Sequence, residues 1–215
     1  MSSNLMTLFA GDSGAGETTI TIQPDPTGGI DTHIEEALPD SNYAVGANLI
    51  ITNVAGNRRI GLIKFDLSAL VGKSIVSAVM SLWSANTLPN PGTLTAYRIL
   101  VANSSWTEGD ATWNFRVSPV TPWAGDSGGD GGLDAGCTQS GVDYSATDVG
   151  HVDMAGQVAN TELQLALDVT EFSTMVLANY GMVVFNSADG IAAFRSSDYV
   201  VDITRRPKLT VVYTG

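Results

Sequence analysis

Apolar and polar residues alternate in short runs along much of the chain. In residues 75–83, Ala78, Met80 and Leu82 fall on one side of an extended strand, while Trp83 falls on the other. This period of two predicts a strand with one buried face. Similar runs rich in Val, Ile and Thr, separated by turn residues, predict further strands at residues 18–23, 49–52, 59–65, 93–101, 181–186, 191–195 and 208–213.

One segment shows helical periodicity instead. Apolar residues recur at three- and four-residue spacing from Phe172 onward. Asp168 is suited to cap the first turn, and Glu171 follows three residues later, as in a capping box. Gly181 stands where a helix would stop. The pattern predicts one short helix over residues 169–180.

Short strands at this spacing predict an all-β fold, and a jelly-roll β-sandwich in particular. The chain has 215 residues, a length that such sandwiches reach as one domain. We expect a single domain over residues 18–215, preceded by a flexible arm at 1–17. Residues 118–150 are mostly Gly, Asp, Ser and Thr, so we expect a long ordered loop that serves an interaction.

The charge balance excludes several partners. The chain carries 22 acidic and 10 basic residues, a net charge of −12. Nucleic acid is disfavoured as a partner, because its binding depends on Lys and Arg displacing counterions, and an anionic membrane surface is disfavoured for the same reason. The acidic excess has two interpretations: it keeps the protein soluble, or some carboxylates hold Ca²⁺ in loops.

Cysteine content and hydropathy limit the cellular compartments that fit the sequence. Cys137 is the one cysteine, so an intramolecular disulfide is impossible. Residues 1–10 contain no Lys or Arg and no sustained apolar stretch, which does not match a secretory signal. No apolar run approaches the roughly 18–20 residues that a membrane span requires. We therefore expect synthesis in a cytoplasm and no membrane insertion.

Two strings look enzymatic. Residues 11–18 (GDSGAGET) resemble a phosphate-binding loop, but Glu17 replaces the lysine that contacts the phosphates. Residues 125–129 (GDSGG) match the serine-nucleophile string of trypsin-like proteases, yet neither His33 nor His151 lies in that family's histidine context. We expect both Glu17 and Ser127 to be ordinary loop residues and the protein not to be an enzyme.

The middle of the chain carries a recognisable signature. Residues 105–114 read SWTEGDATWN, which is similar to a motif of DNRLRE-type domains, a β-sandwich family related to carbohydrate-binding modules. Further strings agree with that family in the same order, although Ala44 stands where the family has a glycine. They are residues 31–34 (DTHI), 42–43 (NY), 64–68 (KFDLS), 77–82 (SAVMSL), 168–181, 194–198 (FRSSD) and 206–210 (RPKLT). The resemblance covers about residues 20–215.

The resemblance implies a binding domain, chiefly for polysaccharides. The sequence starts at Met1 without an export signal or a catalytic partner domain, so we expect a virion surface protein, such as a phage capsid or tail decoration protein. The alternative is a free-standing carbohydrate-binding module or adhesin. Expected partners are virion or other surface proteins, polysaccharide, and further copies of the chain. The arm at 1–17 contains apolar residues that are suited to docking on a neighbouring subunit. The alternative is that the arm is a disordered tail.

Candidate glycan-binding residues combine aromatic faces with arginines. They are Trp83, Arg98, Trp123, Tyr144 and Arg195. For Trp83 the alternative is burial beneath the helix or the long loop. Trp106 and Trp113 are predicted to be core residues that pack two sheets against one another.

Two acids are candidates for cation binding. Asp31 and Asp198 are expected to hold a structural Ca²⁺, on the strength of the acidic excess and of the usual occurrence of Ca²⁺ in sandwiches of this kind.

Overall fold

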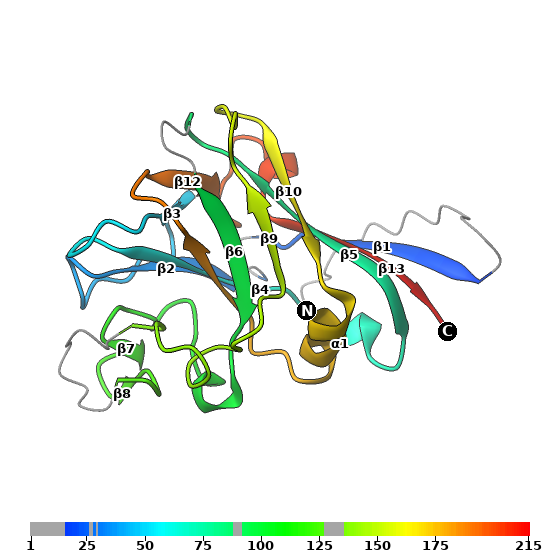
Figure 1. The fold of residues 1–215 in the computed structure, drawn as a ribbon, viewed down its shortest axis with the longest axis horizontal. Helices are drawn as coiled ribbons and strands as arrows, with labels where there is room; N and C mark the ends of the chain where they lie inside the picture. The colour runs from blue at the N-terminus through cyan, green and yellow to red at the C-terminus, as the bar shows by residue number, and fades with distance from the viewer. Residues whose placement is uncertain (1–15, 26–27, 29, 88–91, 127–135) are drawn as a thin grey trace.

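The computed structural model describes residues 16–25, 28, 30–87, 92–126 and 136–215 and consists mainly of antiparallel β-sheet (Figure 1). One sheet has four strands, in the order β1 (Glu17–Ile22), β13 (Lys208–Thr214), β5 (Ser74–Trp83) and β10 (Glu162–Leu167). The other has five strands, in the order β2 (Ile30–Glu35), β4 (Arg59–Lys64), β11 (Met182–Asn186), β6 (Thr93–Arg98) and β9 (Gly150–Asp153).

Two smaller sheets complete the fold. They are the pair β3 (Asn48–Ile51) with β12 (Ala192–Arg195), and the pair β7 (Phe115–Val117) with β8 (Thr121–Pro122). Short 3-10 turns occur at Ser68–Leu70, Val101–Asn103 and Ile203–Arg205. Consecutive strands repeatedly change sheets, as in a jelly roll, and the expected all-β sandwich is confirmed.

The main core lies between the two large sheets. Alternation on β5 turns Ala78, Met80 and Leu82 inward, as expected. On β13, Leu209 pairs with Met80 and Val211 with Ala78, and both are fully buried in the same core. Burial of such side chains contributes about 25 cal/mol per Å² of apolar surface and dominates the stability of a sandwich of this kind.

A second core lies on the outer face of the five-stranded sheet. Residues 99–126 and 136–147, which we call the covering segment, pack over this face at the lower left of Figure 1. Trp106 and Trp113 are 3% and 1% exposed, so their prediction as core residues is confirmed. They do not join the two sheets, however. They belong to the second cluster, with Ile34 and Val183 from the sheet, because the covering segment folds back over the face opposite the main core.

The β3–β12 pair connects the two large sheets along one side. An isolated bridge joins Ser84, which follows β5, to Phe194 on β12, and another joins Thr52, which follows β3, to Arg59 on β4. Phe194 is fully buried in the main core. The outward positions at this junction are therefore Trp83 and Arg195, which flank Ser84 and Phe194 at facing positions.

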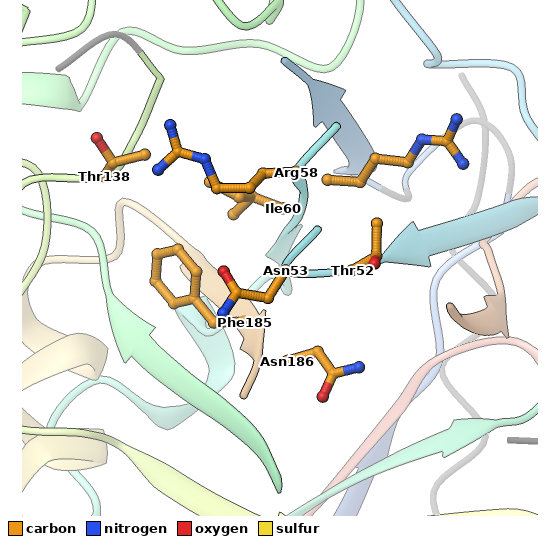
Figure 2. A pocket seen from close by; sticks show the side chains of 8 residues that line it. Thr52, Asn53, Arg58, Ile60, Thr138, Phe185 and Asn186 are labelled. Carbon is orange, nitrogen blue, oxygen red and sulfur yellow. The ribbon is translucent and has the colours of Figure 1, made fainter. Parts of the chain in front are cut away.

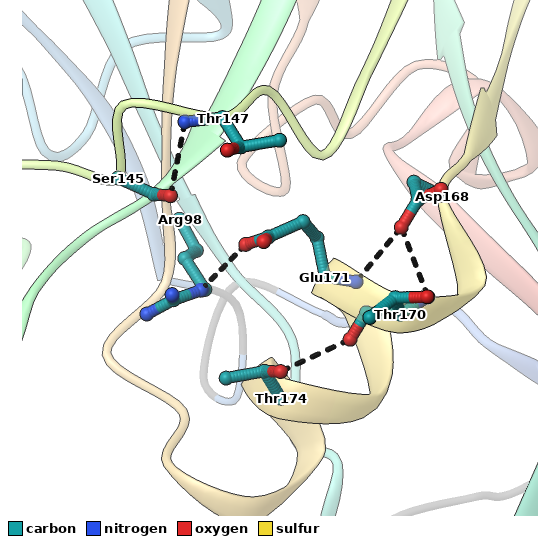
Figure 3. Close-up of polar contacts among 7 residues, drawn as sticks. All are labelled: Arg98, Ser145, Thr147, Asp168, Thr170, Glu171 and Thr174. Carbon is teal, nitrogen blue, oxygen red and sulfur yellow. Dashed lines mark hydrogen bonds and ion pairs between the residues drawn. The ribbon is translucent and has the colours of Figure 1, made fainter.

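The single helix, α1 (Val169–Leu177), lies at one end of the sandwich, where Phe172 and Met175 enter the main core. Asp168 caps it as predicted, because its Oδ1 accepts hydrogen bonds from the amides of Thr170 and Glu171, both at 2.9 Å (Figure 3). The Glu171 side chain forms an ion pair with Arg98 at 2.9 Å instead of completing a capping box.

Two predicted boundaries and the predicted loop need correction. The helix ends at Leu177 rather than at residue 180, because the chain turns there and Gly181, with φ +88°, begins the approach to β11. The predicted strand 93–101 ends at Arg98 and is followed by the turn Val101–Asn103. The predicted loop 118–150 contains the short strand β8 and two isolated bridges. The predicted arm lies almost entirely outside the described residues.

Replacing Asp168 by Ala is expected to lower the free energy of unfolding by about 1 kcal/mol, because two amides of the first helical turn lose their acceptor. Urea denaturation measures this loss. Glu171→Gln serves as the comparison, since its ion pair with Arg98 is partly exposed and is worth less than about 1 kcal/mol. A larger loss for Glu171→Gln than for Asp168→Ala would contradict the assignment of the cap.

Candidate functional site

A groove of about 110 Å³ opens beside the covering segment, where the turn before β4 meets β11. In Figure 2 the Arg58 guanidinium points toward Thr138, and the Phe185 ring lies across from them with the Asn53 amide beside it. The groove is lined by Thr52, Asn53, Arg58, Arg59, Ile60, Thr138, Phe185 and Asn186. It therefore combines one aromatic ring with amide, hydroxyl and guanidinium groups.

Arg58 is held rigidly in the groove wall. Its Nε and Nη2 donate to the two carboxylate oxygens of Glu36 at 3.0 and 2.8 Å, and its guanidinium lies 5.1 Å above the ring of Trp113. The hydrogen bond from Arg58 lowers the pKa of Glu36, and Glu36 in turn raises the pKa of Arg58. Because a guanidinium carries five donors, the bidentate contact leaves Nη1 available for a polar group in the groove.

The aromatic side of the groove is a cluster of three rings. Phe185 lies 5.2 Å from Tyr144 and 5.9 Å from Tyr97 between ring centroids. The Tyr144 hydroxyl donates to the Thr138 carbonyl at 3.3 Å, which links the cluster to the opposite wall. Burial, followed by the neighbouring Tyr97, raises the pKa of Tyr144 to about 12. The cluster is therefore a rigid, uncharged platform at neutral pH.

A fully buried carboxylate organises the covering segment. Asp143 Oδ1 accepts from the Gly125 amide and from Asn103 Nδ2, both at 2.8 Å. Its Oδ2 accepts from the amides of Thr138 and Gln139 at 3.1 and 2.9 Å. A Cβ on Gly125 would lie 2.5 Å from Oδ2, so only glycine fits there. Asp143 thus fixes the loop that carries Thr138 and Tyr144.

Two of the predicted glycan residues lie together on a different surface. Trp83 and Arg195 occupy facing outward positions at the junction of β5 and β12. The Arg205 guanidinium lies 5.3 Å above the Trp83 ring, and Arg195 lies 4.3 Å above the ring of Tyr199. Trp83 is half-buried, and the Arg205 guanidinium covers one face of its ring.

The other three predicted residues are dispersed. Tyr144 belongs to the platform beside the groove. Arg98 lies at the end of the sandwich and is paired with Glu171. Trp123 is 1% exposed, and its indole N–H donates to the Thr112 carbonyl at 2.9 Å, so its ring packs inside the covering segment.

Both predicted cation ligands meet a third acid that the sequence reasoning missed. Asp31, near the start of β2, accepts from the Ser197 amide through Oδ2 at 2.8 Å, and Asp198 is the next residue. The Asp31 amide donates to Glu108 Oε1 at 3.0 Å. Burial raises the pKa of Asp31 to about 7, and Glu108 adds to this shift. Burial and then Asp198 raise the pKa of Glu108 to about 7, and burial raises the pKa of Asp198.

Further polar groups continue along the same face of β2. His33 is 3% exposed and stacks on Tyr43, with ring centroids 4.2 Å apart. Burial, followed by Arg59, lowers the pKa of His33 to about 4. Burial acts to raise the pKa of Glu35, but hydrogen bonds from Arg59 and from the Tyr43 hydroxyl outweigh it and the pKa is lowered. This neutral histidine and paired glutamate make a structural polar seam.

The structure describes only parts of the two strings that look enzymatic. Glu17 is the first residue of β1 and pairs with Thr214, so the string at 11–18 leads into a strand and not into the helix that a phosphate-binding loop requires. Ser127 lies outside the described residues. Cys137 is buried, and burial raises the pKa of its thiol well above the ordinary value. Within the described ranges, no helix is long and apolar enough to span a membrane.

Sequence reasoning missed most of the groove. Asn53 and Arg58 lie in a polar turn between two predicted strands, and Phe185 is an outward residue of a strand predicted at 181–186. The one available signal was an aromatic residue at an outward position, as for Trp83. The buried acceptor Asp143 carried no signal that distinguished it from the other acids of its loop.

Comparison with known protein families finds a match for part of the chain. Residues 17–123 match the family model of Carbohydrate-binding module family 96. The matched part runs from β1 through β8 and includes Arg58 of the groove and the acids Asp31 and Glu108. The chain therefore contains a carbohydrate-binding-module-like domain, as the resemblance implied, whereas membership of the DNRLRE family itself stays a prediction. The curated proteins gave no match to the sequence.

Proposed function

Because residues 17–123 form part of a carbohydrate-binding-module-like domain, we propose that the protein binds polysaccharide without modifying it, and that the groove at Arg58 and Phe185 receives a sugar ring. The groove carries this proposal, because it sets an aromatic ring against fixed polar groups. Carbohydrates need both, since C–H faces pack on aromatic rings while hydroxyls require hydrogen-bond partners.

The Arg58 side chain and the Thr138 backbone are already ordered in the groove. Arg58 is fixed by Glu36 and Trp113, and Thr138 is fixed by Asp143 and Tyr144. Binding therefore costs little side-chain entropy on the protein side. A ligand that makes few contacts, such as one or two sugar units of a polymer, can then still bind specifically. Asn53 adds an amide that donates and accepts, as vicinal hydroxyls require.

The sequence also predicts a virion role, which neither the groove nor the family match supports. Both features favour the alternative, a carbohydrate-binding module or adhesin. Assembly into a virion stays a prediction, and co-sedimentation of the protein with purified particles would test it separately from glycan binding.

The proposed site is tested by a pair of matched arginine variants. Arg58 and Arg205 each lie above a tryptophan, Trp113 at 5.1 Å and Trp83 at 5.3 Å. Affinity electrophoresis against neutral and uronate-containing polysaccharides first identifies the ligand, and calorimetry then measures Kd. We expect Arg58→Met and Phe185→Ala each to weaken binding by about tenfold or more, and Arg205→Met to leave the affinity within about twofold.

One outcome would contradict the assignment of the groove, and a different outcome would contradict the proposed function. If Arg205→Met or Trp83→Ala abolishes binding while Arg58→Met retains it, the site lies at the junction of β5 and β12 and the groove assignment fails. If the wild-type chain binds none of the polysaccharides, the proposed function itself fails. Circular dichroism spectra of each variant must match the wild type for the comparison to count.

A further inference from the structure

The groove wall contains two arginines, and each of them is already paired with a carboxylate. Arg58 binds Glu36 through Nε and Nη2 at 3.0 and 2.8 Å, and the Arg58 amide donates to the same carboxylate at 3.1 Å. Arg59 donates through Nη2 to Glu35 at 2.7 Å. Both carboxylates are largely buried, so solvent screens these pairs only partly. The two guanidinium charges are therefore balanced within the wall of the groove.

The contact with Glu36 also determines which atoms of Arg58 remain for a ligand. A guanidinium binds a carboxylate most strongly through two parallel N–H groups, and the edge formed by Nε and Nη2 is occupied by Glu36. Nη1 remains, and it suits a neutral acceptor such as a sugar hydroxyl. A ligand carboxylate at Nη1 would share one guanidinium with Glu36, and like charges brought together in this way weaken binding.

The acids behind the groove wall add negative charge. The buried carboxylate of Asp143 accepts from the Thr138 amide at 3.1 Å, and the Thr52 hydroxyl donates to the carbonyl of Asp189, an exposed acid, at 3.1 Å. The ion pairs found among the described residues include neither Asp143 nor Asp189. The whole chain carries a net charge of −12. An anion that enters the groove therefore meets balanced or negative surroundings.

We propose that the groove selects uncharged sugar units and that Glu36 is the residue that determines this specificity. The inference rests on the proposed function, because it names the class of sugar that the same site receives. A neutral pyranose presents C–H groups to Phe185 and hydroxyls to Arg58 Nη1 and Asn53 without bringing a second carboxylate against Glu36. A uronate gains little from Arg58, since Glu36 already balances its charge, and binds more weakly than the neutral sugar of the same stereochemistry.

Matched pairs of sugars test the specificity. Hexasaccharides of glucose, mannose and galactose are each compared with the corresponding glucuronate, mannuronate or galacturonate hexasaccharide, in which C6 is a carboxylate. Calorimetry on the full chain at neutral pH measures Kd. We expect the best neutral hexasaccharide to bind about fivefold or more tightly than its uronate partner. Its Kd should change by less than about twofold when salt is raised to about 0.5 M, because salt screens interactions between charges.

A variant of Glu36 tests the residue itself. Glu36→Gln removes the balancing charge but keeps an oxygen that accepts from Arg58. We expect it to bind the uronate hexasaccharide about fivefold or more tightly than the wild type does, with the affinity for the neutral partner unchanged within about threefold. Glu171→Gln is the matched control, because it frees Arg98 outside the groove, and it should change neither affinity.

The outcomes distinguish this inference from the proposed function. If the wild type binds a uronate more tightly than the neutral partner, or if Glu36→Gln gains no affinity for the uronate, the specificity is overturned while polysaccharide binding stands. A gain in Glu171→Gln equal to that in Glu36→Gln would trace the effect to the overall charge and overturn the role of Glu36. If the wild type binds none of the hexasaccharides and none of the polysaccharides, the proposed function fails and the specificity fails with it.

Discussion

The chain with Ala in place of Asp143 is expected to lose about 4 kcal/mol or more of its free energy of unfolding. Asp143 is fully buried, and its two oxygens accept from the amides of Gly125, Thr138 and Gln139 and from the Asn103 side chain. Removing the carboxylate takes the acceptor from two buried donors, the Gly125 amide and the Asn103 side chain, and from two part-buried amides, those of Thr138 and Gln139. A buried donor that loses its acceptor costs about 1–3 kcal/mol, and a part-buried one costs less. The covering segment should loosen first, because these donors all belong to it.

Urea denaturation measures the loss, with Asp153→Ala as the control. Asp153 is exposed and accepts from one nearby amide, that of Ala155 at 2.9 Å, so its removal should cost less than about 1 kcal/mol. Asp143→Asn separates hydrogen bonding from cavity formation, since it keeps the volume but turns an amide N–H toward existing donors. If Asp143→Asn is as stable as the wild type, the carboxylate is not the organising acceptor.

Alternation of residue type predicted most of the strands because one face of each is buried and the other is solvated. β5 is the clearest case, with Ala78, Met80 and Leu82 in the core. β10 has the same pattern, with Leu163, Leu165 and Leu167 inward, and was available to the same reasoning although it was not among the predicted strands.

β2 shows where this reasoning fails. Both faces of the strand are buried. The covering segment packs over the face that carries Ile34, and the opposite face carries Asp31, His33 and Glu35. A buried face made of titratable residues looks solvent-exposed in a sequence. Its burial depends on partners such as Tyr43 and Arg59, which lie at distances in the chain that no local pattern specifies.

The candidate sites depend on the same long-range geometry. Asp31 and Asp198 were identifiable as acids but not as neighbours, and Glu108 joins them only because the covering segment folds over β2. The groove likewise needs the turn at Asn53 and the strand residue Phe185 to meet. Residue type could be read from the sequence, whereas the juxtaposition required the register of the sheet.

The tryptophans give a second test with a large expected effect. Trp113 is 1% exposed, lies beneath the Arg58 guanidinium and packs against Gly136, where an added Cβ would approach its ring to 3.1 Å. Trp113→Ala is expected to lower the free energy of unfolding by about 3–5 kcal/mol, the usual range for truncating a buried tryptophan. It should also weaken glycan binding, because Arg58 loses the ring that supports it.

Trp83→Ala is the matched comparison for Trp113→Ala. Trp83 is half-buried on the outer face of β5, and its indole N–H is buried without a hydrogen-bond acceptor, so truncation removes an unfavourable group together with favourable packing. We expect a loss of about 1.5 kcal/mol or less and an intact fold. Urea denaturation of the two variants under identical conditions measures the difference. A loss for Trp83→Ala equal to that for Trp113→Ala would make Trp83 a core residue, and its candidacy as a glycan-binding residue would end there.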